Sequence, residues 1–273
     1  GTPSISVNQG FAYNFTPTAS DFNEDELTFT IVNKPTWANF DETTGILSGV
    51  PTNSDVGSTN GIVITVSDGT LNDSLPAFDL SVFNVNDAPT INGIPPTNVL
   101  QDATYSFTPS ASDIDFGSSL SFSIINQPSW ATFSAVTGAL TGTPGNADVG
   151  TTSGVVISVS DGALSSSLAA FSITVANVND APVISGTPAT QVNEDSAYSF
   201  IPSASDIDAG STLSFSITNQ PSWTIFSAVT GALTGTPGNA DVGTTSGVVI
   251  SVSDGTLSSS LAAFSITVAN VND

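Results

Sequence analysis

Residues 155–160 read Val-Val-Ile-Ser-Val-Ser and residues 171–175 read Phe-Ser-Ile-Thr-Val, so an apolar side chain stands at every second position along both stretches and most positions between carry a hydroxyl. A period of two sends alternate side chains to opposite faces of a strand, one face packed on a partner sheet and the other solvated. Residues 120–124 (Leu-Ser-Phe-Ser-Ile) repeat the pattern, and turn-forming pairs such as Asp161-Gly162 follow such runs. No apolar stripe with the helical period of 3.6 accompanies them. The sequence therefore predicts an all-β chain.

The same pattern returns along the chain at a fixed interval. Trp37, Trp130 and Trp223 lie 93 residues apart, and residues 120–180 differ from residues 213–273 at only four positions. Repetition at such a period indicates an array of similar domains. About seven short strands in some 90–100 residues is typical of an Ig-like β-sandwich. We therefore expect three tandem Ig-like β-sandwich domains in a linear array, with the boundaries 1–87, 88–180 and 181–273.

The charge balance is strongly acidic. The chain of 273 residues carries 24 Asp and Glu against a single base, Lys34, for a formal net charge of −23. Such a chain has no basic surface for nucleic acid and no apolar run long enough for membrane insertion. Because uncompensated carboxylates repel one another, the charge indicates either a salty medium or neutralisation by bound cations. The chain starts at Gly1 without a Met, as we expect for a segment of a longer protein.

Cys, Met and His are absent from the sequence. Their absence excludes disulfides, thiolate or imidazole metal ligands, and nucleophile–base pairs built on Cys or His. The acids recur at turns every 93 residues instead of forming the single pair of carboxylates that a glycosidase needs across one cleft. We therefore expect no enzyme activity and no catalytic residues.

A recurrent motif gives the chain a family resemblance. Residues 128–133 read Pro-Ser-Trp-Ala-Thr-Phe, residues 137–144 read Thr-Gly-Ala-Leu-Thr-Gly-Thr-Pro, and residues 177–182 read Asn-Val-Asn-Asp-Ala-Pro. The motif closely resembles that of bacterial cadherin-like repeats of the dystroglycan and putative-Ig types, and three copies of it cover the whole chain. The resemblance implies β-sandwich repeats of a large surface or secreted protein, and with them an extracellular or cell-surface location.

The acids fall at turns and repeat junctions, where cadherins hold calcium, and Asp113-Ile114-Asp115 resembles the cadherin Asp-x-Asp turn. Calcium takes about six to eight oxygen ligands, which carboxylates and amides supply. The resemblance implies one calcium site between repeats one and two, formed by Asp55, Asn86, Asp87, Asp113, Asp115 and Asp161. The equivalent site between repeats two and three would be formed by Asp148, Asn179, Asp180, Asp206, Asp208 and Asp254, together with Asp102.

Other interpretations of these acids stay open. Asp-Gly at residues 161–162 is also a favoured hairpin turn, and Asp and Asn stabilise turns by bonding their own backbone. Repeat one departs from the pattern, because Asp21-Phe22-Asn23 replaces the Asp-x-Asp turn and Gln9 stands where repeat three has Glu194. If calcium uses a glutamate at that position, we expect weaker or single-ion sites where it is missing.

Two hypotheses for function follow. The first is an extracellular structural or adhesive array, a calcium-stiffened spacer of a large surface adhesin or filament. The alternative is a carbohydrate- or protein-binding module of a secreted polysaccharide-degrading or matrix protein, in which Trp37, Trp130 and Trp223 could stack on sugars instead of packing between sheets. The expected partners are neighbouring repeats of the same protein, and like chains or polysaccharide, but not nucleic acid.

Overall fold

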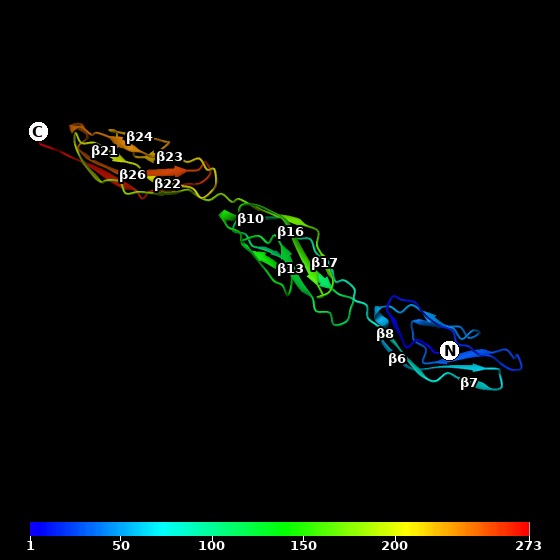
Figure 1. Cartoon of the computed structure of the whole chain (residues 1–273). Coiled ribbons are helices and arrows are strands. Elements are labelled where there is room, and N and C mark those ends of the chain that lie inside the picture. Colours follow the sequence, from blue (N-terminus) through cyan, green and yellow to red (C-terminus); the bar gives the residue numbers. More distant parts are fainter. Residues whose placement is uncertain (273) are drawn as a thin grey trace.

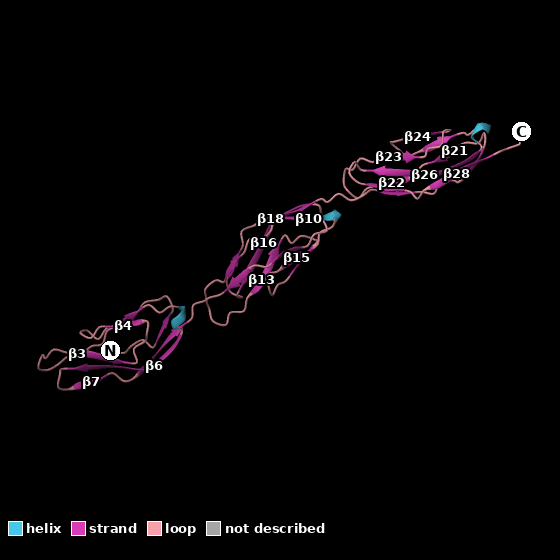
Figure 2. Ribbon diagram, turned by 180° about the vertical axis from the view of Figure 1, so that it is seen from behind, coloured by secondary structure: helices cyan, strands magenta, loops and turns pink. Residues whose placement is uncertain are grey.

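The computed structural model describes residues 1–272, which form three elongated β-sandwich units joined end to end (Figure 1). The prediction of an all-β fold with three tandem sandwiches is confirmed. The only helical turns in residues 1–272 are three 3-10 turns, η1 (Asn53–Asp55), η2 (Asn146–Asp148) and η3 (Asn239–Asp241). Figure 2 shows each of them at the end of its unit where the chain leaves it. Among the described residues, no helix is long and apolar enough to cross a membrane.

The second unit illustrates the two main sheets that all three units share. One sheet has the order β10-β18-β16-β13, with β17 also paired to β16, and the facing sheet has the order β11-β15-β14. A two-stranded ladder joins β9 to β12. The strands are β9 (Thr90–Asn92), β10 (Asn98–Leu100), β11 (Tyr105–Phe107), β12 (Ser110–Ser112), β13 (Ser121–Ile125), β14 (Ala131–Phe133), β15 (Leu140–Gly142), β16 (Gly150–Ser160), β17 (Ser165–Ser167) and β18 (Phe171–Ala176).

The flanking units repeat this arrangement. The first has the sheets β1-β8-β6-β3, with β7 on β6, and β2-β5-β4; the third has β20-β28-β26-β23, with β27 on β26, β21-β25-β24 and β19-β22. The strands of the first are β1 (Ser6–Asn8), β2 (Tyr13–Phe15), β3 (Thr28–Val32), β4 (Ala38–Phe40), β5 (Leu47–Gly49), β6 (Gly57–Ser67), β7 (Asn72–Ser74) and β8 (Phe78–Phe83). Those of the third are β19 (Val183–Ser185), β20 (Gln191–Asn193), β21 (Tyr198–Phe200), β22 (Ser203–Ser205), β23 (Ser214–Thr218), β24 (Thr224–Phe226), β25 (Leu233–Gly235), β26 (Gly243–Ser253), β27 (Ser258–Ser260) and β28 (Phe264–Ala269).

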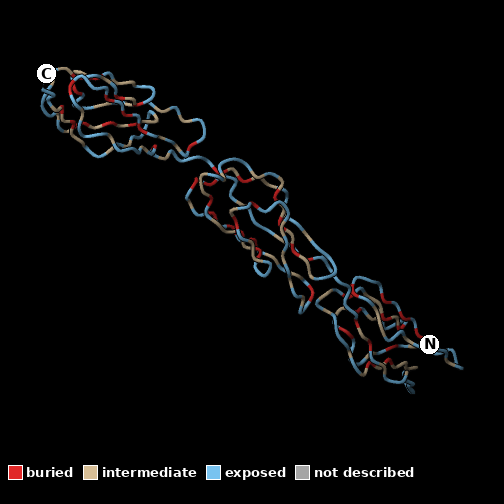
Figure 3. Tube along the Cα trace, turned by 60° about the vertical axis from the view of Figure 1, so that its left-hand side comes forward, coloured by how far each residue is buried: buried red, intermediate tan, exposed pale blue. Residues whose placement is uncertain are grey.

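The alternating residues build a narrow core in each unit. On β16, Val155, Ile157 and Val159 are fully buried. Leu140 of the facing sheet joins the same core. Figure 3 shows buried residues in all three units, interspersed along the chain with partly buried and exposed ones. The hydroxyls of the alternate positions stay accessible and pair across strands, as Ser158 does with Ser167 at 2.7 Å.

The central strand of each unit changes partner at a bulge. On β16 the register against β18 shifts between Thr152 and Val155, and Gly154 there has a φ of +69°. Asn126, itself at a φ of +54°, donates a hydrogen bond from Nδ2 to the carbonyl of Gly154 at 2.9 Å. Only Gly, and less often Asn, adopts such a conformation at low cost. The bulge lets one long strand serve both halves of its sheet.

The three tryptophans pack inside the sandwich. Trp130 lies edge-on to buried Tyr105, with ring centroids 5.6 Å apart, and Trp37 and Trp223 make the same contact with Tyr13 and Tyr198. All three indoles are partly buried. This geometry agrees with the packing interpretation of the tryptophans.

In each unit, a parallel strand pair places an early strand beside the last strand, at the end where the chain leaves the unit. Strand β10 runs parallel to the last strand, β18, with Leu100 opposite Ala176. The residue after β10 therefore lies beside the linker that leaves the unit. The η2 turn, between β15 and β16, stands at the same end. These elements and the entry loops of the next unit form the junction.

Candidate metal centre at the repeat junctions

Asp115 is the central side chain of the first junction. The residue is 6% exposed. Oδ1 accepts a hydrogen bond from Nδ2 of Asn53 in the η1 turn at 2.7 Å, and Oδ2 accepts one from the backbone N–H of Asp87 in the linker at 2.7 Å. Its own N–H donates to Oδ1 of Asp113 at 2.8 Å. One aspartate of repeat two therefore holds repeat one, the linker and its own loop.

Asp161 provides a second connection across this junction. Its Oδ1 accepts from the N–H groups of Ala163 and Leu164 at 2.6 and 2.7 Å, which closes the hairpin turn. Its Oδ2 accepts from Nδ2 of Asn86 in the linker at 2.8 Å. The backbone hydrogen bonds from Leu164 and Ala163, and then the Asn86 amide, lower the pKa of Asp161 below its usual value. Donors to a carboxylate stabilise its charged form.

The second junction reproduces the first. Asp208 is buried and accepts from Nδ2 of Asn146 at 2.9 Å and from the N–H of Asp180 at 2.7 Å. The N–H of Asp208 donates to Asp206 at 2.8 Å, and Asn179 donates to Oδ2 of Asp254 at 2.8 Å. Hydrogen bonds from the Thr256 N–H, the Asn179 amide and the Leu257 N–H lower the pKa of Asp254.

The structure thus brings together, at each junction, most of the residues that the sequence predicted. At the first junction these are Asn86, Asp87, Asp113, Asp115 and Asp161, and at the second Asn179, Asp180, Asp206, Asp208 and Asp254. Asp102 also lines the second junction, beside a cleft of about 680 Å³ that Asn146, Asp180 and Asp206 line with it. A smaller cleft of about 470 Å³ lies beside Asp87 and Asp113 at the first junction.

Asp55 and Asp148 have a different environment. Asp55 turns back on its own 3-10 turn, where Oδ2 accepts from the N–H and Oγ1 of Thr52 at 2.8 and 2.7 Å. Asp148 does the same with the N–H of Gly145 at 2.9 Å. The residue that crosses the junction is the asparagine two positions earlier, Asn53 or Asn146. Sequence reasoning missed these asparagines, although their identical place in Asn-Ser-Asp and Asn-Ala-Asp was a visible signal.

A further position was recognised in the sequence only as a difference between repeats. Gln9, Gln101 and Glu194 follow β1, β10 and β20, and all three side chains are buried. Nε2 of Gln9 donates to Asp87 Oδ2 at 3.1 Å, and Nε2 of Gln101 donates to Asp180 Oδ2 at 2.8 Å. These side chains are therefore part of the junctions.

Buried oxygen atoms without a hydrogen-bond donor gather at these ends of the units. Among residues 1–272, the buried side-chain polar atoms that lack any partner are Oε1 of Gln9, Oδ2 of Asp113, Oε2 of Glu194 and Oδ2 of Asp206. All four are acceptors, and the two aspartates belong to the two internal junctions. Leaving such a group unpaired costs roughly 1–3 kcal/mol of folding free energy. Each internal junction therefore contains a buried carboxylate oxygen that a cation or a hydrogen-bond donor would stabilise.

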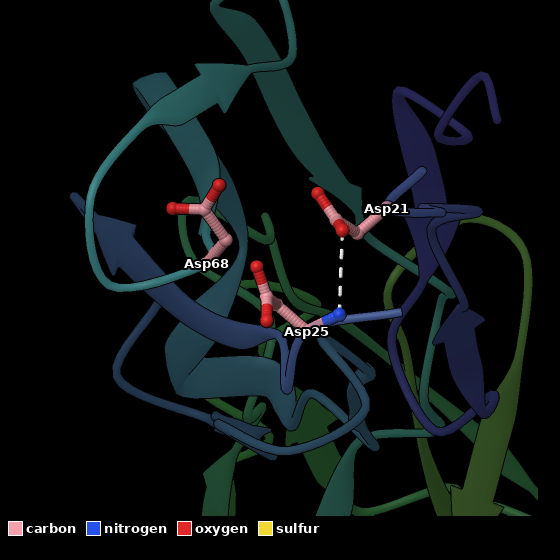
Figure 4. Close-up of side chains that lie close together, drawn as sticks. All are labelled: Asp21, Asp25 and Asp68. Carbon is pink, nitrogen blue, oxygen red and sulfur yellow. Dashed lines mark hydrogen bonds between the residues drawn. The ribbon is translucent and has the colours of Figure 1, made fainter. Parts of the chain in front are cut away.

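The entry end of the first unit carries a more open acidic group. Asp21, Asp25 and Asp68 offer carboxylate oxygens within 4.8 Å of one another, and in residues 1–272 they are the one such group of three carboxylates. Figure 4 shows the three side chains facing a common space, with the N–H of Asp25 bonded to Asp21. Asp68 is the equivalent of Asp161. At the internal junctions, amide groups separate the carboxylates, so the acids there do not converge as closely.

Two paired sheets with cross-strand hydroxyls and a parallel first strand define this chain as a tandem array of Ig-like β-sandwich domains. It belongs to the Putative Ig domain family, which matches residues 1–83, 88–176 and 181–269. A search of curated protein sequences finds no significant match.

The chain is similar in fold to a solved structure, and weaker matches accompany it. The EC22-24 segment of mouse cadherin-23 matches with a TM-score of 0.51 at 16% identity, over 98% of this chain and 96% of that one. Protocadherin gammaB7 EC3-6, solved as a cis-dimer, gives 0.48 at 18% identity, over 98% and 72%. An endo-fucoidan hydrolase of glycoside hydrolase family 107 gives 0.31 at 22% identity, over 98% and 43%. The cadherin-23 match shows the fold alone, and the two lower scores support no argument.

Proposed function

We propose that this chain is a spacer segment of a large extracellular adhesin or surface filament, and that calcium bound at its two internal junctions stiffens it. The observation that carries the proposal is the pair of buried, unpartnered carboxylate oxygens, Asp113 Oδ2 and Asp206 Oδ2, at equivalent places in the two junctions. A carboxylate oxygen without a donor is a ready ligand for a hard cation.

The donor set fits calcium. At the first junction, carboxylates of Asp87, Asp113, Asp115 and Asp161 surround the linker, and the amides of Asn53 and Asn86 reach into it. All the available ligand atoms are oxygens, which suits calcium and gives no advantage to softer metals. The same chemistry recurs at the second junction through Asp180, Asp206, Asp208 and Asp254, with Asn146 and Asn179.

The asparagine side chains can act as hydrogen-bond donors without the cation and as oxygen ligands with it. Nδ2 of Asn53 and of Asn86 now donates to a carboxylate of the next unit and keeps like charges apart. An amide also carries an acceptor oxygen, so rotation about its last bond turns Oδ1 toward the space that Nδ2 occupied. That rotation would give a bound cation two more oxygens, one from repeat one and one from the linker.

The candidate ligands come from different parts of the molecule, and this determines how a bound ion would stiffen it. Asn53 comes from the body of repeat one, Asp87 from the linker and Asp115 from repeat two. An ion held by all three removes the hinge freedom of the linker, whereas the bare carboxylates repel one another. The linear arrangement of the units in Figure 1 is consistent with a spacer. The carbohydrate-binding alternative has no comparable support, since each Trp packs on a buried Tyr.

Isothermal titration of the 273-residue chain with calcium chloride tests the proposal. We expect saturable binding, and a melting temperature that falls when EGTA is added. Asp115→Asn and Asp208→Asn should each remove the calcium binding of one junction. Each replaces a carboxylate that is hydrogen-bonded from two sides of that junction. Glu42→Gln, an equal change of charge at an exposed residue in the β4–β5 turn, is the control.

No calcium heat together with melting that EGTA does not alter would refute the calcium function. Binding that Asp115→Asn and Glu42→Gln reduce equally would show only general attraction to an acidic chain, and would also count against the junction sites.

A further inference from the structure

We infer that repeat one has an open strand-binding site along residues 18–20. Its occupant is a short, uncharged strand with a central isoleucine, supplied by the polypeptide that leads into Gly1 in the parent protein. The inference does not depend on the calcium function. It follows from a comparison of the three units, because repeats two and three each contain a strand that has no counterpart among the described residues of repeat one.

The segment that borders the site forms a strand only where it has a partner. Residues 13–21 read Tyr-Asn-Phe-Thr-Pro-Thr-Ala-Ser-Asp, and residues 105–113 read Tyr-Ser-Phe-Thr-Pro-Ser-Ala-Ser-Asp, so residues 18–20 correspond to β12. Strand β12 pairs with β9, with Ala111 opposite Ile91, and β22 pairs with β19 in the same way. In residues 1–272 no strand pairs with residues 18–20, and these residues are not part of a strand.

The additional strand also covers the core in the other two units. Ile91 packs against the second core beside Phe122 and Leu168, and Ile184 packs against the third core. Strand β9 contacts β16 and β17, and β19 contacts β26 and β27. The strand therefore pairs with the backbone of its neighbour and closes the side of the sandwich next to the long strand.

In repeat one the corresponding side of the sandwich has a cleft of about 80 Å³. Most of the side chains that line it are apolar, and they correspond to those around Ile91 in repeat two. They include Pro17, Ala19, Phe29, Ile64, Val66 and Leu75. The cleft thus has the position and the apolar lining of the place that an isoleucine fills in the other units.

The exposure of single residues agrees with an uncovered site. Val66 of β6 is only partly buried, whereas Val159 and Val252, at the same place on β16 and β26, are fully buried. Ala19 is exposed, whereas its counterpart Ala111 in β12 is partly buried. These residues lose their cover in repeat one although their own sequence is nearly unchanged.

The two strands that fill the equivalent places define the chemistry of the occupant. Residues 90–92 read Thr-Ile-Asn and residues 183–185 read Val-Ile-Ser, and neither strand carries a charge. An extended segment at an exposed sheet edge gains main-chain hydrogen bonds, while the pocket for its central side chain gives specificity. A charged central residue would lose its hydration against Ile64 and Phe29, so the site excludes it.

The place of Gly1 points to the source of the strand. Gly93 and Gly186 follow β9 and β19, and a Cβ built on either would meet the ring of Phe107 or Phe200; a Cβ on Gly1 would likewise meet the ring of Phe15. The Gly1 nitrogen lies 3.3 Å from Oγ1 of Thr18, at the end of the site. A strand joined to Gly1 would therefore reach the site without closing a long loop.

A second copy of the chain is a poorer source. Its own strands of this type, β9 and β19, are already paired within their units. One of them would have to leave its place before it could bind repeat one of a neighbour.

An extension of the 273-residue chain tests the inference. A copy of residues 86–92 (Asn-Asp-Ala-Pro-Thr-Ile-Asn) is added before Gly1, so that Gly1 has the same preceding sequence as Gly93. We expect hydrogen exchange at residues 18–20 to slow by about tenfold or more, because these backbone groups gain a partner strand. The matched control is the same extension with aspartate in place of its isoleucine, and it should leave exchange unchanged. Equal exchange in the two extended chains would overturn the inference.

A variant of repeat two checks the same contact in the chain as it stands. Ile91→Asp should speed hydrogen exchange at residues 110–112, because a charged side chain no longer packs against the core. Ile94→Asp, the same change at a residue that is 94% exposed, should not. Equal exchange in the two variants would show that the central isoleucine does not hold the strand, and would count against the inference.

Analytical ultracentrifugation separates the two sources of the strand. We expect the 273-residue chain to remain a monomer over a wide range of concentrations. A dimer that the isoleucine extension abolishes and the aspartate extension leaves intact would assign the site to a second copy, and would overturn the proposed source. None of these outcomes changes the calcium titration, so the two proposals succeed or fail separately.

Discussion

A single aspartate can close a turn and hold a neighbouring unit, because its two oxygens have separate partners. In Asp161 and Asp254, Oδ1 accepts the N–H groups of the hairpin turn, while Oδ2 accepts the amide of Asn86 or Asn179 from the preceding linker. The interpretation as turn chemistry and the interpretation as a junction ligand are therefore compatible. Asp68, in repeat one, makes the turn bonds, and its carboxylate lies beside those of Asp21 and Asp25.

These aspartates predict how acid acts on the molecule. Hydrogen bonds hold the pKa of Asp68, Asp161 and Asp254 below the usual aspartate value of 3.8. A lowered folded-state pKa gives stabilisation that is fully present above the unfolded value and is lost as the pH falls through the folded one. We expect this contribution to be constant between pH 7 and about 5 and to be lost progressively below about pH 4, as the pH falls through the lowered folded-state pKa values.

Melting temperatures measured in EGTA between pH 7 and 2.5 check this expectation. Asp161→Asn, which cannot ionise, should show a smaller loss between pH 4 and 2.5 than the wild type. An equal loss in the two proteins would contradict the assignment to Asp161.

At the scale of elements, a close contact between β25 and the segment that carries Trp223 fixes the position of the sheet β21-β25-β24. A Cβ built on Gly235 of β25 would lie 2.4 Å from the carbonyl oxygen of Trp223 and 3.0 Å from its ring atom Cε3. The equivalent Gly142 and Gly49 meet Trp130 and Trp37 in the same way. The glycine lets β25 approach the start of β24 closely enough for Trp223 to pack on Tyr198.

Gly235→Ala should therefore destabilise repeat three. The methyl group meets backbone atoms, which cannot rotate away as a flexible side chain can, so we expect a loss of about 1–3 kcal/mol in the free energy of unfolding. For a domain of this size, that loss lowers the melting temperature by several degrees. Differential scanning calorimetry measures the shift.

Gly238→Ala is the matched control for this substitution. A Cβ at Gly238 meets nothing within 4 Å, and its φ is −101°, a value that alanine adopts without strain. A melting temperature lowered equally by both substitutions would show that the Trp223 contact is not the cause.

At the scale of the whole molecule, the charge of the central unit is concentrated where it meets its neighbours. The acids of the second unit, Asp102, Asp113, Asp115, Asp148, Asp161 and Asp180, all lie in turns or the linker at its two ends. The long strand β16 between those ends is uncharged. Conditions that change the charge of the chain should therefore act on the angle between units more than on the sandwiches themselves.

Small-angle X-ray scattering can measure that effect. With calcium we expect a rod whose maximum dimension matches three units in line. With EGTA we expect a smaller radius of gyration and a broader distance distribution, because repulsion and free linkers allow bending. The double variant Asp115→Asn, Asp208→Asn should scatter alike in both conditions. Identical wild-type curves with and without calcium would contradict the stiffening.

The sequence by itself determined the strands, the repeat and the position of the charges. Alternation in residues 155–160 is a local property, since period-two burial requires only a strand with one buried face. The interval between Trp37, Trp130 and Trp223 likewise needs no knowledge of the fold. The acidic turns could be assigned to junctions because turns stand at the ends of sandwiches.

Only the tertiary structure decided which side chains cross a junction. Asp55 and Asn53 are two residues apart in one turn, and the cap formed with Thr52 turns the aspartate inward, which leaves the asparagine to reach Asp115. Gln101 and Asp180 lie far apart in the sequence and meet because β10 runs parallel to β18. Such contacts depend on long-range strand pairing and on the direction of single side chains, and neither leaves a periodic pattern in the sequence.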